Sequence, residues 1–318
     1  MPRMPSSDRR LGAHLPLATG MVKAVERANE IGATTMQIWT DNPTAWRRRA
    51  APPVEREAFA ERVVQHDIRP VAIHAAYLCN LAGPDPDLFD RTIEILAGEL
   101  RGAPTFRARF VNVHIGSHRG TGVATGTERV AEGVRRTLAE IDDGPDAAML
   151  VLENSVGGGW GLGTTVDELA GIAEAVERAG VPRHRLGFCL DTAHAWGAGI
   201  DVAHPDAIDA TLAEFDARIG LDRLVMVHLN DSRSELGSRA DRHEHIGAGL
   251  IGPVGLGHLL RHPDLAHPAF ILETPGMDAG YDAINLERAR ALLAGQPLAP
   301  LPPAAFELAS SRARTAPA

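Results

Sequence analysis

Eight short apolar runs, separated by longer amphipathic stretches, are the feature that most restricts how this chain can fold. The runs are LGAHLP (11–16), TMQIWT (35–40), PVAIHAAY (70–77), RFVNVHIGS (109–117), AMLVLENS (148–155), LGFCLDTAH (186–194), LVMVHLNDS (224–232) and AFILETPG (269–276). Continuous apolar runs of this length are typical of parallel strands, which are buried on both faces. Each run is therefore predicted to contain a strand.

Helical patterns fill the intervals between these runs. Three of them are GMVKAVERANEIGA (20–33), FDRTIEILAGELRG (89–102) and TVDELAGIAEAVERAG (165–180). The last begins with Thr164 or Thr165 as a cap and ends at Gly180. Eight strand–helix units predict an α/β fold, a (β/α)₈ TIM barrel, in a single domain over residues 10–295. A doubly wound open sheet is the rival, but the glycine fingerprint expected after its first strand is missing.

The two ends of the chain and the cysteines bear on its surroundings. Residues 296–318 are rich in Pro, Ala and Ser, which predicts a short disordered C-terminal extension. The N-terminal sequence has no apolar signal core, and no run approaches the ~20 apolar residues of a membrane span. Cys79 and Cys189 form no CxxC motif, as is usual in a reducing compartment. We therefore expect a soluble, cytoplasmic protein without membrane association.

The net charge restricts the partners that the chain can have. At −9, it has the wrong sign for holding nucleic acid by overall electrostatic attraction. A polyanionic partner would therefore need a local basic surface or bound cations.

Ionisable residues gather at the ends of the predicted strands. Six of the eight runs carry them at or near the C-terminal end: His74, His114, Glu153, Asp191 with His194, His228, and Glu273. In a barrel these ends converge on one mouth, where active sites lie. Carboxylates placed there repel one another unless cations lie between them. Imidazole together with carboxylate is the ligand set of a divalent transition metal, zinc first.

A ten-residue loop, SRADRHEHIG (238–247), adds two further candidate ligands. Asp241 and His243 form a DxH pair there, as Asp191 and His194 form a DxxH pair after the sixth run. In an extended loop, side chains two residues apart point the same way, so both can face one ion. Nine candidate ligands are too many for one tetrahedral ion, and with one bridging carboxylate they suit three.

These motifs resemble those of the endonuclease IV family, the metal-dependent apurinic/apyrimidinic endonucleases. The likeness runs in order through HAAYLCNL (74–81), VNVHIGSH (111–118), LENSVGGGWGLG (152–163), DTAHAWGAGID (191–201), HLND (228–231) and GSRADRHEHIG (237–247). The last three segments are the most specific. The resemblance implies that His74 and His114 hold a first metal with Glu153. Glu153 would bridge to a second metal, whose other ligands are Asp191, His228 and Glu273. A third would be held by His194, Asp241 and His243.

The resemblance also implies an activity. It is the deoxyribonuclease IV type of DNA repair reaction, cleavage of the phosphodiester 5′ to an abasic site to leave a 3′-hydroxyl, together with removal of 3′-blocking groups. Three cations, zinc with manganese as the alternative at one or more positions, would neutralise the phosphodiester and lower the pKa of a bridging water to give hydroxide. Glu153 would be the catalytic carboxylate. The partner would be duplex DNA with abasic sites or blocked 3′ ends, and the protein a monomer.

Candidate DNA contacts follow from the same resemblance. Tyr77 and Leu78 match the loop that the family inserts into DNA. Arg239 and Arg242 are candidates for phosphate contacts, with solvated loop charges as the alternative reading. The DNPTAW segment has Thr44 where family members often carry an arginine that enters the DNA stack.

Two other function classes stay open. Xylose-isomerase-like sugar isomerases and epimerases share the barrel and use a metal, but they need fewer ligands and have no use for Asp241 and His243. A non-catalytic binding module is the third class, and nine ligand-type residues argue against it.

Overall fold

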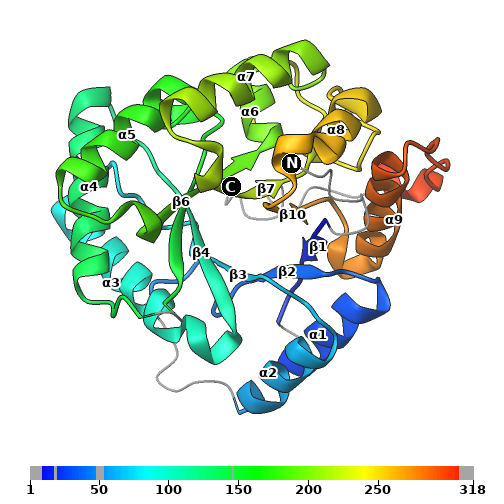
Figure 1. Cartoon of the computed structure of the whole chain (residues 1–318), viewed down its shortest axis with the longest axis horizontal. Coiled ribbons are helices and arrows are strands. Elements are labelled where there is room, and N and C mark those ends of the chain that lie inside the picture. Colours follow the sequence, from blue (N-terminus) through cyan, green and yellow to red (C-terminus); the bar gives the residue numbers. More distant parts are fainter. Residues whose placement is uncertain (1–8, 18–19, 48–53, 145–146, 308–318) are drawn as a thin grey trace.

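A computed structural model describes residues 9–17, 20–47, 54–144 and 147–307, and it confirms the predicted barrel. Eight parallel strands close on themselves in the order β1-β10-β7-β6-β5-β4-β3-β2 (Figure 1). The strands are β1 (Leu11–His14), β2 (Thr35–Ile38), β3 (Val71–His74), β4 (Ala108–His114), β5 (Met149–Glu153), β6 (Leu186–Asp191), β7 (Leu224–His228) and β10 (Ala269–Leu272). Each overlaps one of the eight apolar runs.

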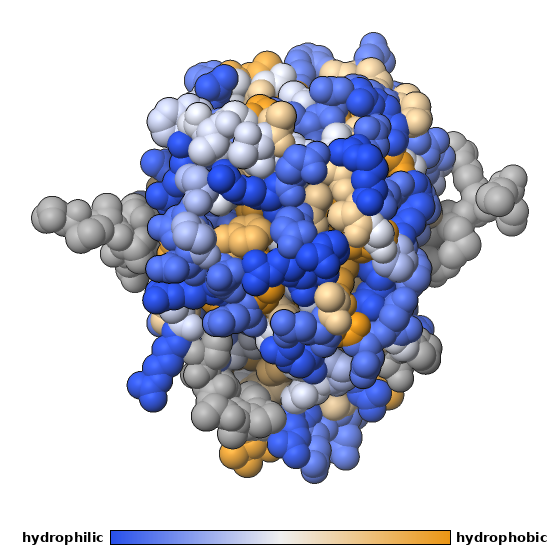
Figure 2. Space-filling view, turned by 90° about the vertical axis from the view of Figure 1, so that its left-hand side faces the viewer, coloured by the Kyte–Doolittle hydropathy of each residue, from blue (hydrophilic) through white to orange (hydrophobic). Residues whose placement is uncertain are grey.

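Helices surround the barrel as an outer ring (Figure 1). They are α1 (Met21–Glu30), α2 (Arg56–Gln65), α3 (Pro86–Gly102), α4 (Val123–Ala139), α5 (Val166–Arg178), α6 (Thr192–Ala198), α7 (Pro205–Arg218), α8 (Gly252–Arg261) and α9 (Tyr281–Leu293). The face on the left of Figure 1, where α3, α4 and α5 lie, is mainly hydrophilic (Figure 2). Thr165 caps α5, because its side chain accepts a hydrogen bond from the Glu168 N–H at 3.2 Å. Among the described residues, no helix has the length and apolarity that crossing a membrane requires.

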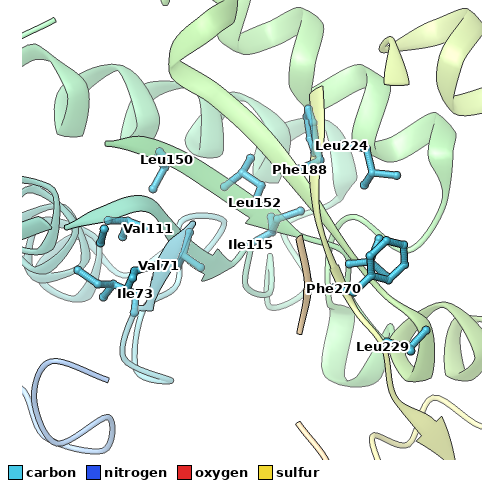
Figure 3. Close-up of a cluster of buried hydrophobic side chains, with 14 of the residues drawn as sticks. Val71, Ile73, Val111, Ile115, Leu150, Leu152, Phe188, Leu224, Leu229 and Phe270 are labelled. Carbon is cyan, nitrogen blue, oxygen red and sulfur yellow. The ribbon is translucent and has the colours of Figure 1, made fainter. Parts of the chain in front are cut away.

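The strands bury side chains on both of their faces. Residues such as Val71, Val111 and Leu150 point outward and pack with the helices in the main hydrophobic core (Figure 3). The alternate residues point into the barrel and form a second cluster of Ala72, Phe110, Val151, Cys189, Met226 and Ile271. This two-residue period follows from the pleat of a strand, and it explains why the runs read as continuously apolar.

Two residues further along, the inward-facing positions become polar. His74 follows Ala72, Glu153 follows Val151, Asp191 follows Cys189, His228 follows Met226, and Glu273 follows Ile271. The strand register places His114 beside Glu153 and Asp191 beside His228. A polar layer therefore lies directly above the apolar one, at the C-terminal mouth of the barrel.

The loop after β7 carries a small element that the sequence did not predict. β8 (Asp231–Ser232) pairs antiparallel with β9 (His243–Glu244). Asp231 fixes the following segment, because its buried carboxylate accepts the N–H groups of Gly249 and Ile251, each at 3.0 Å. This pairing holds the DxH motif over the mouth.

The predicted extension, residues 296–318, is attached to the barrel in its described part. Residues 303–307 form a short 3₁₀ helix in which Ala305 is buried. The Ala305 carbonyl lies 3.0 Å from His245 Nε2, and the Ala299 carbonyl accepts a hydrogen bond from Arg288. Some described residues after 295 therefore pack against the barrel. The remainder of that prediction, at residues 308–318, lies outside the described residues.

Candidate metal centre

The mouth of the barrel brings the nine predicted ligands together in three groups. In the first, the Nε2 atoms of His74 and His114 lie 3.4 and 3.5 Å from Oε2 of Glu153. The three residues come from the adjacent strands β3, β4 and β5. Their ligand atoms lie close enough together to share one ion.

The second group surrounds the other carboxylate oxygen of Glu153. His228 Nδ1 lies 3.4 Å from Glu153 Oε1, 3.3 Å from Glu273 Oε2 and 3.9 Å from Asp191 Oδ2. These four ligand-type residues can also share one ion. Because its two oxygens face different groups, Glu153 has the arrangement of a bridging carboxylate.

The third group includes the two ligands from the loop. Asp241 lies 3.5 Å from His194 Nε2 and 3.1 Å from His243 Nε2. Asp191 Oδ2 is 3.6 Å from the same nitrogen of His243, so Asp191 lies between the second group and the third. The two-residue spacing of Asp241 and His243 thus turns both side chains toward one point.

Hydrogen bonds orient four of the histidine rings. The Nδ1 atoms of His74, His194 and His243 face the backbone carbonyls of Ala75, Asn154 and Glu273 at 2.7, 3.0 and 2.8 Å. A carbonyl oxygen only accepts, so each Nδ1 carries the proton and each Nε2 keeps its lone pair. In His228 the proton is on Nε2, because this nitrogen faces the Gln37 Oε1 acceptor at 3.1 Å. Its Nδ1 atom keeps the lone pair and faces the carboxylates.

Amide side chains hold the carboxylates, and the sequence analysis missed all of them. Asn112 donates to Glu153 at 2.6 Å, Asn230 donates to Asp191 at 2.8 Å, and Gln37 donates to Glu273 at 2.8 Å. Gln37 and Asn112 occupy inward-facing strand positions, so the two-residue period could have identified them. Asn230 follows β7 and has no such signal.

His14 is another residue that the sequence analysis missed. It ends β1, and its ring nitrogen lies 3.4 Å from Glu273 Oε1. Its position at a strand end was the available signal. Burial lowers the pKa of His14 despite the neighbouring carboxylate, so this imidazole is neutral at neutral pH.

The donor atoms themselves indicate a cation. Glu153 Oε1, His228 Nδ1 and His243 Nε2 are buried, and within the described part of the chain none has a hydrogen-bond partner. An unsatisfied buried polar atom costs free energy, about 1 to 3 kcal/mol and more for a charged group. A divalent ion in each group would satisfy all three atoms at once. The residues present therefore fit metal binding.

The charges of the site agree with this fit. Burial opposes charge on His228, yet the neighbouring carboxylates of Glu273 and Glu153 outweigh it and raise the pKa of His228 well above its ordinary value. The carboxylates thus attract positive charge to the spot that a cation would fill. Burial lowers the pKa of His114, which keeps that imidazole neutral and able to bind metal. Burial also raises the pKa of the Cys189 thiol to about 11, so this thiol is protonated at neutral pH.

The mouth opens into two adjoining cavities. Both are lined by His114, His194, Asp241 and Tyr77, whose side chain is 40% exposed. Arg242 lines the first cavity and Leu78 the second. Because the two cavities share these four residues, together they form one groove at the mouth of the barrel, and candidate metal ligands line it.

Two other residues named from the sequence lie at the edge of this groove. Arg239 is exposed, and its backbone N–H donates to the Gly197 carbonyl at 2.9 Å. Thr44 is exposed, and its hydroxyl donates to Asn42 Oδ1 at 2.8 Å. The Thr44 loop touches the Tyr77 loop, because the Tyr77 N–H donates to the Pro43 carbonyl at 3.0 Å.

Comparison with known proteins gives consistent results. A family model described as "Xylose isomerase-like TIM barrel" matches residues 25–296. A protein of Methanoculleus marisnigri named "Probable endonuclease 4" is 39% identical over 282 residues, which is 89% of this chain and 98% of the relative. The crystal structure of endonuclease IV from Thermus thermophilus matches with a TM-score of 0.77 and 38% identity, covering 90% of this chain and 99% of that one. A D-tagatose 3-epimerase-like protein matches with a TM-score of 0.65 at 17% identity over 90% of this chain and 97% of that one, a likeness of fold alone.

Proposed function

Because the chain belongs to the endonuclease IV family, we propose that it is a DNA repair enzyme that hydrolyses the phosphodiester 5′ to an abasic site. Such a cut leaves a 3′-hydroxyl. The observation that carries this proposal is the third group of ligands, His194 with Asp241 and His243. A sugar isomerase needs no such group, whereas a phosphodiester with attacking and leaving oxygens can use three cations.

We assign one ion to each group, with Glu153 bridging the first and the second. Zinc suits the histidine-rich first and third groups, and manganese is the alternative in the carboxylate-rich second group. When bound, divalent cations supply charge that neutralises the phosphodiester and activates water for in-line attack.

The chain's own residues hold this site in position. Asn112, Asn230 and Gln37 keep the carboxylate oxygens aimed at the ligand positions, and the backbone carbonyls keep the histidine lone pairs aimed there too. Because these partners are buried and rigid, little reorganisation is needed when the substrate binds. Glu153 contributes both of its oxygens, so it is the residue on which the site depends most.

DNA would lie in the groove above. Tyr77 and Leu78 project from the loop after β3, where they can replace the stacking lost at an abasic nucleotide. Arg239 and Arg242 can contact phosphates of the backbone. A chain with a net charge of −9 would thus bind DNA through bound cations and a few rim arginines. We further propose that the enzyme acts as a cytoplasmic monomer and also removes 3′-blocking groups.

Cleavage of an end-labelled duplex with one abasic-site analogue tests the proposal, with the undamaged duplex as matched control. The expected result is one cut, on the 5′ side of the lesion, whose product a DNA polymerase extends without further treatment. A chelator should abolish this cleavage, and zinc should restore it. The proposal would be contradicted if the zinc-loaded protein cut both duplexes equally or cut neither.

A further inference from the structure

A second cluster of metal-ligand side chains lies outside the barrel, between α7 and α8. His258 lies in the last turn of α8, and His262 is the residue that caps the C-terminal end of this helix. Asp209 of α7 faces them, with its Oδ1 atom 2.5 Å from His258 Nε2 and 3.3 Å from His262 Nε2. None of the three lines the cavities at the mouth.

We propose that Asp209, His258 and His262 form a separate binding site for a divalent transition metal. Their ligand atoms all lie within 4.8 Å of one another. Ligands arranged tetrahedrally at the usual zinc bond lengths are about 3.3 Å apart, which is the distance already present at His262. The shorter contact to His258 must open slightly, and the half-exposed Asp209 carboxylate can rotate to allow it.

The chemistry of the cluster selects its metal. Two imidazole nitrogens and one carboxylate favour zinc, nickel or copper over magnesium or calcium, which prefer oxygen ligands. The hydrogen bond from His258 lowers the pKa of Asp209, so this carboxylate is ionised at neutral pH. Because Asp209 is half exposed, water can complete the coordination. A bound ion would join α7 to α8.

One adjustment accompanies metal binding at His262. Its Nδ1 atom accepts a hydrogen bond from the Asp264 N–H at 3.3 Å, so the proton lies on Nε2. His258 must release from Nε2 the proton that it now donates to Asp209. An ion at Nε2 of His262 would displace the proton there to Nδ1 and open the contact with the Asp264 N–H, and the Asp264 carboxylate, now 4.0 Å from Nδ1, would have to move closer to accept a hydrogen bond from it. A carboxylate behind a metal-bound histidine is a common arrangement.

Zinc content per chain tests this site, measured after dialysis of the full-length protein against micromolar free zinc. We expect Asp209→Asn and His258→Gln each to hold one zinc fewer than the unaltered protein. His204→Gln is the matched control, because His204 is an exposed histidine paired with Asp201 at 2.8 Å in the segment before α7. Circular dichroism checks that each variant is folded. Equal zinc content in all four proteins would overturn the proposal. The cluster would then be only an ion-paired contact between α7 and α8.

An independent observation concerns Trp160, in the loop between β5 and α5. Its side chain is 63% exposed, and its backbone has φ of +64°, in the left-handed region that favours glycine. The loop is nevertheless held firmly. The Ser117 hydroxyl donates to the Gly159 carbonyl at 2.5 Å, and the His118 N–H donates to the Trp160 carbonyl at 3.1 Å. A strained and exposed tryptophan on a fixed loop points to a role outside the fold.

The position of the loop indicates what that role is. Gly158 and Gly161, on either side of Trp160, line the same cavity as Glu153 and Asp241. Arg119, which is exposed, lines it too and offers a guanidinium for phosphate. The indole therefore stands at the rim of the groove proposed for DNA.

We infer, on the basis of the proposed function, that Trp160 stacks on a base or sugar of the DNA beside the lesion. Loss of one stacked base is expected to weaken binding by about 5- to 150-fold.

Binding of the abasic duplex to variants at this position tests the inference. Trp160→Gly removes both the ring and the strain, so we expect Kd to rise by about 5- to 150-fold while the melting temperature stays equal or rises. Trp160→Phe should recover most of the affinity, and Val254→Ala, at an exposed residue of α8, is the matched control. Should Trp160→Gly bind like the unaltered protein while that protein cuts abasic DNA, the inference fails and the proposed function stands. If the unaltered protein neither binds nor cuts the duplex, both fail.

Discussion

The interior of the barrel has two layers of side chains that come from the same strands but differ in polarity and in how fully their polar atoms are hydrogen-bonded. The lower layer, which includes Val151 and Met226, is apolar and closely packed. In the upper layer, Glu153 and His228 are buried as deeply, yet each keeps a donor atom that has no hydrogen-bond partner among the described residues. Only two residues, roughly 7 Å of strand, separate the layers. The barrel thus separates stability from function along each strand, and variants in one layer should leave the other nearly unaffected.

The largest effect is expected for Glu153→Gln. The amide cannot bridge two ions, and loss of metal charge stabilisation worth several kcal/mol should reduce cleavage by about 1,000-fold or more. The fold should persist, because Glu153 is not part of the apolar packing. Steady-state cleavage of abasic duplex and thermal unfolding would be measured together. An active Glu153→Gln enzyme would mean that the attacking water is activated elsewhere.

The loop ligands should have the next largest effect. Asp241→Ala and His243→Ala each remove a ligand of the third group, and we expect each to lower metal content by about one ion and activity by about 100- to 1,000-fold. Elemental analysis and the cleavage assay check both quantities. Unchanged metal content in both variants would show that Asp241 and His243 hold no third ion.

The lower layer should respond in the opposite way. Met226→Ala leaves a cavity beneath the polar layer, which should reduce the free energy of unfolding by about 2 to 5 kcal/mol. Urea denaturation measures this change. Metal content should stay the same, since Met226 supplies no ligand. Loss of metal in a folded Met226→Ala protein would show that the two layers are coupled.

The smallest effect is expected at Tyr77, which lies above both layers. Tyr77→Ala should weaken binding of abasic duplex by about 5- to 150-fold, equivalent to 1 to 3 kcal/mol of stacking, with metal content unchanged. Thr44→Arg should tighten binding, because it adds a cation to the loop that contacts the Tyr77 loop. Wild-type affinity in Tyr77→Ala would refute the insertion of this ring.

The layers also explain what the sequence could and could not predict. Strands buried on both faces leave continuous apolar runs, so all eight were identified, and the ionisable residues at their ends identified the mouth. The pairing of β8 with β9 was missed, because a two-residue ladder is set by distant contacts such as those of Asp231. The described part of the C-terminal segment contacts the barrel through a few hydrogen bonds, the buried Ala305 and the partly buried Leu298, which its composition does not reveal.

The supporting residues of the site were harder to predict than its ligands. Histidine and carboxylate are recognisable as ligand types, whereas Gln37 and Asn230 gain their roles only from neighbours far along the chain. Gln37 and His228, for example, are 191 residues apart. A pattern within one strand contains no information about such a pair.

Anomalous X-ray diffraction at the zinc edge, from crystals of the zinc-loaded protein, tests the central claim most directly, because it locates each ion separately. We expect three peaks at the mouth, one in each ligand group, with Glu153 between the first and the second. The peak expected between α7 and α8 is distinguished by its position. A single peak at the mouth, or none near Asp241 and His243, would contradict the three-metal site and with it the proposed mechanism.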